Sequence, residues 1–124
     1  MVLLVAAGGA VGAVLRYGLS GLVQGRTGPV FPYGTLAVNV VGCLLMGVIS
    51  ELAESRGALE PGTRALITVG VLGGFTTFSA FGNETLNLLR DGERALAAGN
   101  IAANLILALA AVWAGRAAAA GLWR

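Results

Sequence analysis

Residues 34–50 read GTLAVNVVGCLLMGVIS, a run without a charged side chain that stops just before Glu51. Extended to Leu52, this run is long enough for a helix to cross a hydrocarbon core about 30 Å thick. Further apolar runs lie on both sides of it, so spans are expected at about residues 2–23, 34–52, 64–89 and 96–115. Because backbone groups find no water in lipid, each span is expected to be helical. The sequence predicts an all-α membrane protein, with residues 1–124 forming a single four-span domain.

The composition agrees with a chain that is solvated by lipid. Of the 124 residues, 56% are hydrophobic and 11% are charged, whereas soluble domains carry about 25% charged residues. The 20 glycines suit the close packing of membrane helices. The basic residues are scattered rather than clustered, which argues against a nucleic-acid partner. With no histidine and one cysteine, we expect no zinc site, no intrachain disulfide and no enzymatic activity.

The links between the spans determine the expected topology. Four spans place both termini on the same side of the membrane, and the positive-inside rule then counts the basic residues of each side. The arginines outside the spans are Arg56, Arg64, Arg116 and Arg124 on the terminal side, and Arg26, Arg90 and Arg94 on the other. Because this bias is weak, two alternatives stand: another signal sets one orientation, or the chain inserts both ways. Insertion both ways leads to an antiparallel homodimer with a two-fold axis in the membrane plane.

The third span contains the most unusual stretch, GVLGGFTTFSAFGNE at residues 70–84. Gly73 and Gly74 are expected to weaken the helix near mid-membrane, and a break there would free carbonyl oxygens that suit a hard cation. Phe78 and Phe81 are three residues apart and share a helix face, where the positive edges of their rings suit a small anion. A kinked helix packed by aromatic and small residues explains the same stretch without an ion.

Two polar groups inside the other spans are costly in lipid and indicate either a pathway or specific packing. Asn39 lies four residues after Thr35 on the same helix face. Its amide suits a bond to a neighbouring helix as well as donation to a passing anion. Arg16 follows three glycines in the first span, and it either snorkels to the interface or acts within the span.

Three motifs occur in order, one in each of the first three spans: GAVGAVLRY at 9–17, GTLAVNVVG at 34–42 and GGFTTFSAF at 73–81. Together they resemble the Fluc (CrcB) family of bacterial fluoride channels, and the resemblance covers essentially the whole chain. It implies a fluoride-selective channel of the bacterial inner membrane, which gives passive fluoride efflux and so fluoride resistance. It also implies an antiparallel, dual-topology homodimer with a structural Na⁺ at its centre, in contact with lipid and without nucleic acid.

The resemblance assigns the family's functional residues to this sequence by their positions in the three motifs. The family's sodium-binding carbonyls fall on Gly73 and Thr76, and Arg16 matches a first-span arginine to which we assign a structural role. The fluoride pore implied in this way consists of Asn39, Phe78, Phe81, Ser79, Thr77, Thr35 and Glu84.

Two departures from the family pattern affect the pore. Ala80 stands where relatives often carry a hydroxyl group, and the fourth span has no Ser, Thr or Tyr. Asn100 and Asn104, four residues apart on one helix face, either replace those hydroxyl groups or only pack.

Two other functions fit a four-span plan. A small dual-topology multidrug transporter would need a membrane-embedded carboxylate, but the first span has none, and Glu51 and Glu84 lie toward span ends. A membrane scaffold without transport activity would explain the glycines but not the clustered Phe, Thr and Asn residues.

Overall fold

A computed structural model describes residues 1–55, 57 and 59–122 of the chain. Arg56 and Arg124, which contribute to the topology count above, lie outside the described residues. The helical segments are α1 (Val2–Thr27), α2 (Tyr33–Ser55), α3 (Pro61–Arg64), the π-helix η1 (Ala65–Leu72), α4 (Gly73–Phe75), α5 (Phe78–Arg90) and α6 (Arg94–Leu122).

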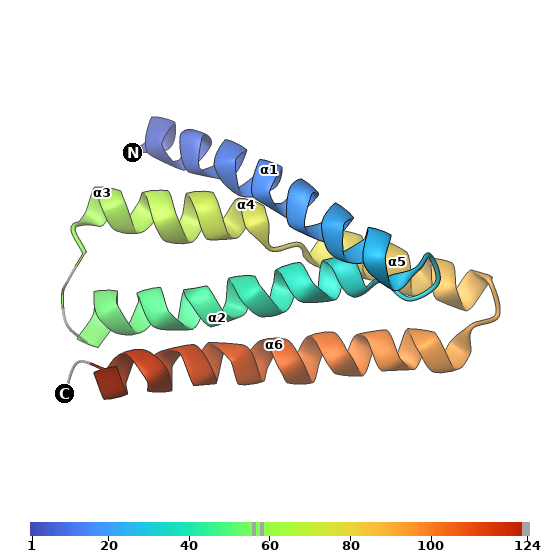
Figure 1. Cartoon of the computed structure of the whole chain (residues 1–124). Helices are drawn as coiled ribbons and strands as arrows, with labels where there is room; N and C mark the ends of the chain where they lie inside the picture. Colours follow the sequence, from blue (N-terminus) through green and yellow to red (C-terminus); the bar gives the residue numbers. More distant parts are fainter. Residues whose placement is uncertain (56, 58, 123–124) are drawn as a thin grey trace.

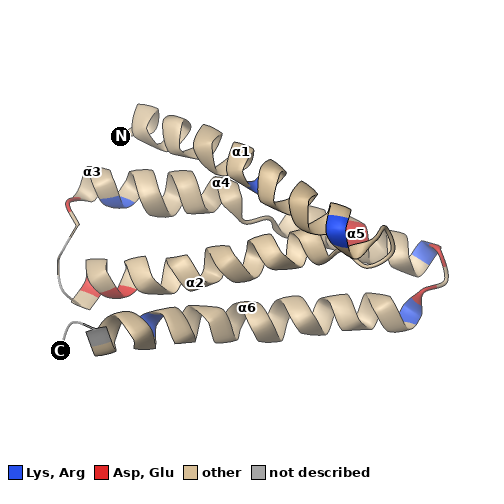
Figure 2. Cartoon of the chain, in the orientation of Figure 1, with Lys and Arg blue, Asp and Glu red and all other residues tan. Residues whose placement is uncertain are grey.

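Among the described residues, four helical stretches are long and apolar enough to cross a membrane: Val2–Thr27, Tyr33–Ser55, Pro61–Arg90 and Arg94–Gly121. The prediction of an all-helical, multi-pass membrane protein is therefore confirmed. The start of α1 and the end of α6 lie at the same end of the bundle (Figure 1). The charged residues gather toward the two ends of the bundle (Figure 2), with Arg16 part-way along α1. This distribution leaves an apolar middle that suits lipid.

Helices α2 and α6 run side by side along the bundle (Figure 1), and glycines bring their backbones together. A Cβ atom on Gly47 or on Gly115 would overlap a backbone carbonyl oxygen of the opposite helix. Such close approach is how membrane helices gain contact energy, since lipid offers no hydrophobic driving force for their association. At one end of this pair, Arg116 forms ion pairs with Glu54 at 2.9 Å and with Glu51 at 3.7 Å.

Helix α1 packs against η1 and α4 through a second glycine contact. A Cβ atom on Gly12 would overlap the carbonyl oxygen of Val71, and one on Gly8 would lie 2.5 Å from that of Leu66. Gly8 and Gly12 therefore serve the packing of the first span on the third. This contact sets the register of α1 against the stretch that carries the unusual residues.

The loop between α1 and α2 is held by one side chain. The Nε2 atom of Gln24 donates hydrogen bonds to the carbonyl oxygens of Gly28 (2.6 Å) and Phe31 (2.9 Å). Its Oε1 atom accepts a hydrogen bond from the backbone N–H of Gly34 at 3.0 Å. The same side chain thus closes the loop and caps the first turn of α2.

Replacing Gln24 by leucine is expected to lower the free energy of unfolding by about 1–3 kcal/mol, because three backbone groups lose a partner. Gln24→Glu keeps an acceptor for Gly34 but turns a second carboxylate oxygen toward the carbonyl oxygens of Gly28 and Phe31, so its loss should be at least as large as that of Gln24→Leu. Thermal unfolding in detergent, followed by circular dichroism, measures both. Equal melting temperatures for the wild type and Gln24→Leu would show that the loop does not depend on this side chain.

Candidate functional site

The backbone leaves helical geometry between α4 and α5. Thr76 (φ −81°, ψ 154°) and Thr77 (φ −148°, ψ 118°) are extended, whereas Gly73 keeps helical angles (φ −63°, ψ −40°). The change in backbone geometry therefore comes after the glycines. The sequence had suggested a break at the glycines themselves. Gly74 instead serves the contact with α1, because a Cβ atom there would lie 2.7 Å from the carbonyl oxygen of Gly9. Helix α5 restarts where the Thr77 hydroxyl accepts a hydrogen bond from a backbone N–H, as in a typical N-cap.

Asn39 of α2 satisfies the extended backbone. Its Oδ1 atom accepts a hydrogen bond from the N–H of Thr77 at 2.9 Å, and its Nδ2 atom donates to the carbonyl oxygen of Thr77 at 3.1 Å. The second Nδ2 hydrogen goes to Oδ1 of Asn104 at 3.1 Å. The amide of Asn39 thus stands in for the helical partners that Thr77 has lost, so both of its donors are already in use.

Several carbonyl oxygens lose their helical donors in this arrangement, among them those of Gly73 and Thr76. In a continuous α-helix, Gly73 would accept from the N–H of Thr77, and Thr76 from that of Ala80. Those N–H groups donate instead to Asn39 Oδ1 at 2.9 Å and to Thr77 Oγ1 at 3.2 Å. The carbonyl oxygens of Gly73 and Thr76 are therefore without their usual helical donors, and backbone carbonyl oxygens are among the ligands that hard cations take.

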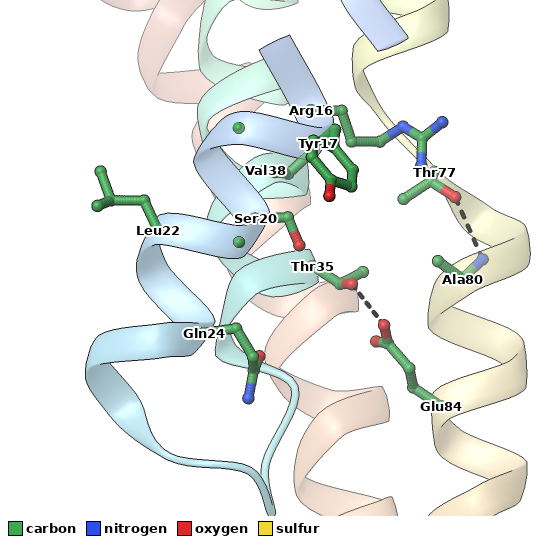
Figure 3. A pocket seen from close by; sticks show the side chains of 12 residues that line it. Arg16, Tyr17, Ser20, Leu22, Gln24, Thr35, Val38, Thr77, Ala80 and Glu84 are labelled. Carbon is green, nitrogen blue, oxygen red and sulfur yellow. Dashed lines mark hydrogen bonds between the residues drawn. The ribbon is translucent and has the colours of Figure 1, made fainter. Parts of the chain in front are cut away.

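Arg16 connects α1 to the same stretch. Its Nε atom donates a hydrogen bond to the carbonyl oxygen of Gly74 at 3.2 Å. Arg16 and Thr77 both line the same cavity (Figure 3). One of the five guanidinium N–H donors is therefore used to hold the backbone just before the extended residues, and Arg16 remains inside the bundle rather than at a helix end.

Phe78 and Phe81 form an edge-to-face pair beside the extended residues. Their ring centroids are 5.4 Å apart and the ring planes make an angle of 74°. Both rings line a cavity of 240 Å³, together with Asn39, Thr77, Asn104 and mostly apolar side chains. Phe81 is 8% exposed, but Phe78 is 81% exposed on the single chain. The edge of one ring meets the face of the other, as the ring quadrupoles favour.

A larger cavity of 540 Å³ shares Thr77 with the smaller one in its lining. Figure 3 shows Arg16, Thr35 and Glu84 around it. The Thr35 hydroxyl donates a hydrogen bond to Glu84 Oε1 at 2.7 Å. The other carboxylate oxygen is buried and has no partner within the described part of the chain.

The structure thus brings the predicted pore residues together around two cavities that meet at Thr77. Asn39, Phe78 and Phe81 lie on one cavity, and Thr35 and Glu84 on the other. Ser79 approaches the same place, with its hydroxyl oxygen 3.4 Å from that of Thr77.

Asn100 and Asn104 of α6 are the polar residues whose role the sequence left open. They are 1% and 6% exposed, respectively, and hydrogen-bond to each other. Asn104 also lines the smaller cavity and contacts Asn39. Their spacing of four residues in an otherwise apolar span was the signal that pointed to a shared interior face.

The family model described as "CrcB-like protein, Camphor Resistance (CrcB)" matches residues 3–116. The chain belongs to the CrcB family. The family that the three motifs suggested is therefore confirmed.

Several relatives of this CrcB chain carry the name "Fluoride-specific ion channel FluC". The protein from Opitutus terrae is 51% identical over 122 residues, covering 97% of this chain and 92% of its own length. The protein from Shewanella amazonensis is 54% identical over 115 residues, covering 93% and 92%, respectively. The protein from Geobacter sulfurreducens is 48% identical over 118 residues, covering 95% of each chain.

Proposed function

We propose that this CrcB chain forms a fluoride-selective channel, which lets fluoride leave the cell passively across the bacterial inner membrane. The observation that carries the proposal is the cavity where the edge-to-face pair of Phe78 and Phe81 meets the polar groups of Asn39 and Thr77. Relatives that share about half of their aligned residues with this chain are named fluoride-specific ion channels, and these names support the proposal. The activity is transport rather than catalysis.

The chemistry of the cavity suits a small, strongly hydrated anion. A pore must replace the water around fluoride with compact donors and must still release the ion. The positive edges of phenyl rings interact with an anion without a full charge. The hydroxyl groups of Thr77 and Ser79 share one hydrogen bond at 3.4 Å. Because each hydroxyl has one hydrogen, the group that accepts in this pair keeps its own hydrogen for the ion.

The proposed assembly is an antiparallel, dual-topology homodimer. Phe78 is 81% exposed within a membrane-spanning stretch, beside the polar hydroxyl groups of Thr77 and Ser79. Polar groups that face lipid are costly, so a second copy is the better neighbour for this surface. In such a dimer the extended residues Thr76 and Thr77 would lie near mid-membrane, as an interruption of the third span.

The released carbonyl oxygens of Gly73 and Thr76 fit a Na⁺ ion at the dimer centre. Two such oxygens from each copy would provide a ligand set of the kind that hard cations prefer. The ion would balance the negative ends of the backbone dipoles that the extended residues expose. Both ligands would be backbone carbonyl oxygens, so their positions depend on the backbone conformation. Asn39 and Thr77 hold that conformation through their hydrogen bonds to the backbone.

Removal of sodium tests this site. The melting temperature of the purified protein should rise with NaCl concentration and should not rise with equal concentrations of N-methylglucamine chloride. A ligand at about 100 times its dissociation constant stabilises the folded state by about 2.7 kcal/mol. Identical melting temperatures in both salts would contradict a bound sodium ion.

Fluoride efflux from liposomes tests the function itself. The purified protein is reconstituted, a potassium ionophore is added, and fluoride release is followed with a fluoride electrode. The expected result is rapid release of fluoride, while chloride is retained in a parallel experiment. A folded protein that releases neither ion would contradict the channel and would favour a scaffold. Equal release of both ions would contradict the selectivity.

A further inference from the structure

We infer that Asn100 and Asn104 are positioning residues of the conduction site. Through these two side chains, a row of hydrogen bonds joins the amide of Asn39 at one end to the backbone of Phe81 at the other. Asn39 and Phe81 both line the cavity assigned to the ion, so this inference rests on the proposed function. It assigns the fourth span a role in the site that does not require its own hydroxyl groups.

Each bond in the row donates in the same direction. Asn39 Nδ2 donates to Asn104 Oδ1 at 3.1 Å, and Asn104 Nδ2 donates to the carbonyl oxygen and Oδ1 of Asn100 at 2.9 and 3.0 Å. Asn100 Nδ2 donates to the hydroxyl oxygen of Thr85 at 2.9 Å, and this hydroxyl donates to the carbonyl oxygen of Phe81 at 2.8 Å. Bonds aligned in this way polarise one another, so each strengthens its neighbours.

The surroundings make every bond in the row costly to lose. Asn100 is 1% exposed, Asn104 is 6% exposed and Thr85 is 8% exposed. An amide without a partner in such an interior bears the full cost of desolvation. The spacing of Asn100 and Asn104 places both on the face of α6 that meets α2 and α5.

At the Asn39 end, the row fixes the orientation of the Asn39 amide. One Nδ2 hydrogen is bound to Thr77, and Asn104 accepts the other. Without Asn104, this second hydrogen would be unpaired in a mostly apolar cavity, and the amide would lose one of its three anchoring contacts. Asn104 therefore keeps Asn39 directed at Thr77, and Thr77 is the residue that both cavities share.

At the Phe81 end, the row holds the first turn of α5 against α6. The Thr85 hydroxyl bonds back to Phe81 and is itself bound by Asn100, so the turn that carries Phe81 is tied to another span. Phe81 is in edge-to-face contact with Phe78. A row that links Asn39 to Phe81 therefore sets the relative position of the amide and the rings.

The test compares Asn104→Leu with Asn104→Asp. Leucine has the same number and branching of side-chain heavy atoms as asparagine, and neither donor nor acceptor. A carboxyl group in an apolar interior stays protonated, and it still offers an oxygen to Asn39 and an O–H to Asn100. Asn83→Leu is the matched control, because Asn83 is an exposed asparagine on α5. Fluoride efflux, chloride efflux and elution on gel filtration are measured for each variant and the wild type.

We expect Asn104→Leu to slow fluoride efflux by about tenfold or more, the factor that corresponds to one buried polar group left without its partner. Asn104→Asp should recover most of this loss, and Asn83→Leu should stay within about twofold of the wild type. Efflux through Asn104→Leu at the wild-type rate would overturn the inference. So would an Asn104→Asp variant as slow as Asn104→Leu, because the contact with Asn39 would then not matter.

A second measurement does not depend on transport. Amide hydrogen exchange of a peptide covering residues 76–82 reports whether the Thr77 N–H and the start of α5 are held. Exchange there should be faster in Asn104→Leu and in Thr85→Val, which keeps the shape of Thr85 and replaces Asn104→Leu if that variant does not fold. Unchanged exchange in a folded variant would overturn the inference. If the wild type transports no fluoride but exchange changes as expected, the proposed function fails and the positioning row stands.

Discussion

Replacing Phe78 by isoleucine is expected to abolish selective fluoride efflux and to leave the folded protein intact. The ring is 81% exposed on the chain, so its loss removes little packing within the chain. Isoleucine is apolar and of comparable size, but it has no ring edge with positive character to meet an anion. We expect efflux to fall by about 100-fold or more, since the ion would lose a ring-edge contact along the proposed route.

Phe81→Ile should have the same effect on efflux, with an added loss of stability because Phe81 is buried. Phe31→Ile is the matched control: Phe31 lies in the loop before α2, where its ring packs on Tyr33. All variants are reconstituted at equal protein content, and fluoride efflux is compared with elution on gel filtration. Efflux through Phe78→Ile close to the wild-type rate would show that the rings do not line the path.

A second large effect is expected from a single methyl group at Gly12. Gly12→Ala places a Cβ atom where the carbonyl oxygen of Val71 lies, and 2.9 Å from the backbone nitrogen of Phe75. Neither of these backbone atoms moves without shifting a whole helix, so α1 must separate from η1 and α4. Overpacking of this kind costs about 1–3 kcal/mol, a large part of the stability of a small protein.

Gly9→Ala is the matched control for Gly12→Ala. Gly9 lies on the same helix, and a Cβ atom there meets nothing within 4 Å. We expect its melting temperature to equal or exceed that of the wild type, since alanine favours a helix more than glycine does. Thermal unfolding in detergent compares the two substitutions directly. Equal melting temperatures for both variants would contradict the backbone contact between α1 and η1.

The site was partly predictable from the sequence, and the missing part has one cause. The motifs identified Asn39, Phe78 and Phe81, and the structure places all three on one cavity. The sequence did not show that both donors of the Asn39 amide are already used, by Thr77 and by Asn104. Such pairings depend on how the spans are rotated and shifted against one another, and no local pattern contains that information.

The position of the extended residues illustrates the same limit. Gly73 and Gly74 were the obvious weak point, because glycine is a poor helix former. In the structure they stay helical, and Thr76 and Thr77 are extended instead. A side chain of another span made the difference: Asn39 satisfies the backbone of Thr77 across 38 residues of sequence.

The four membrane-length apolar helices of the described residues follow from the sequence alone. That result follows from local rules, because apolar length and the need to satisfy backbone groups in lipid act within each span. The pairing of polar groups inside the spans depends instead on how the helices pack: Arg16 pairs with Gly74 across 58 residues of sequence, and Asn39 with Asn104 across 65. These pairs form where backbone contacts at glycines set the register of the helices, and that register is a property of the packed bundle.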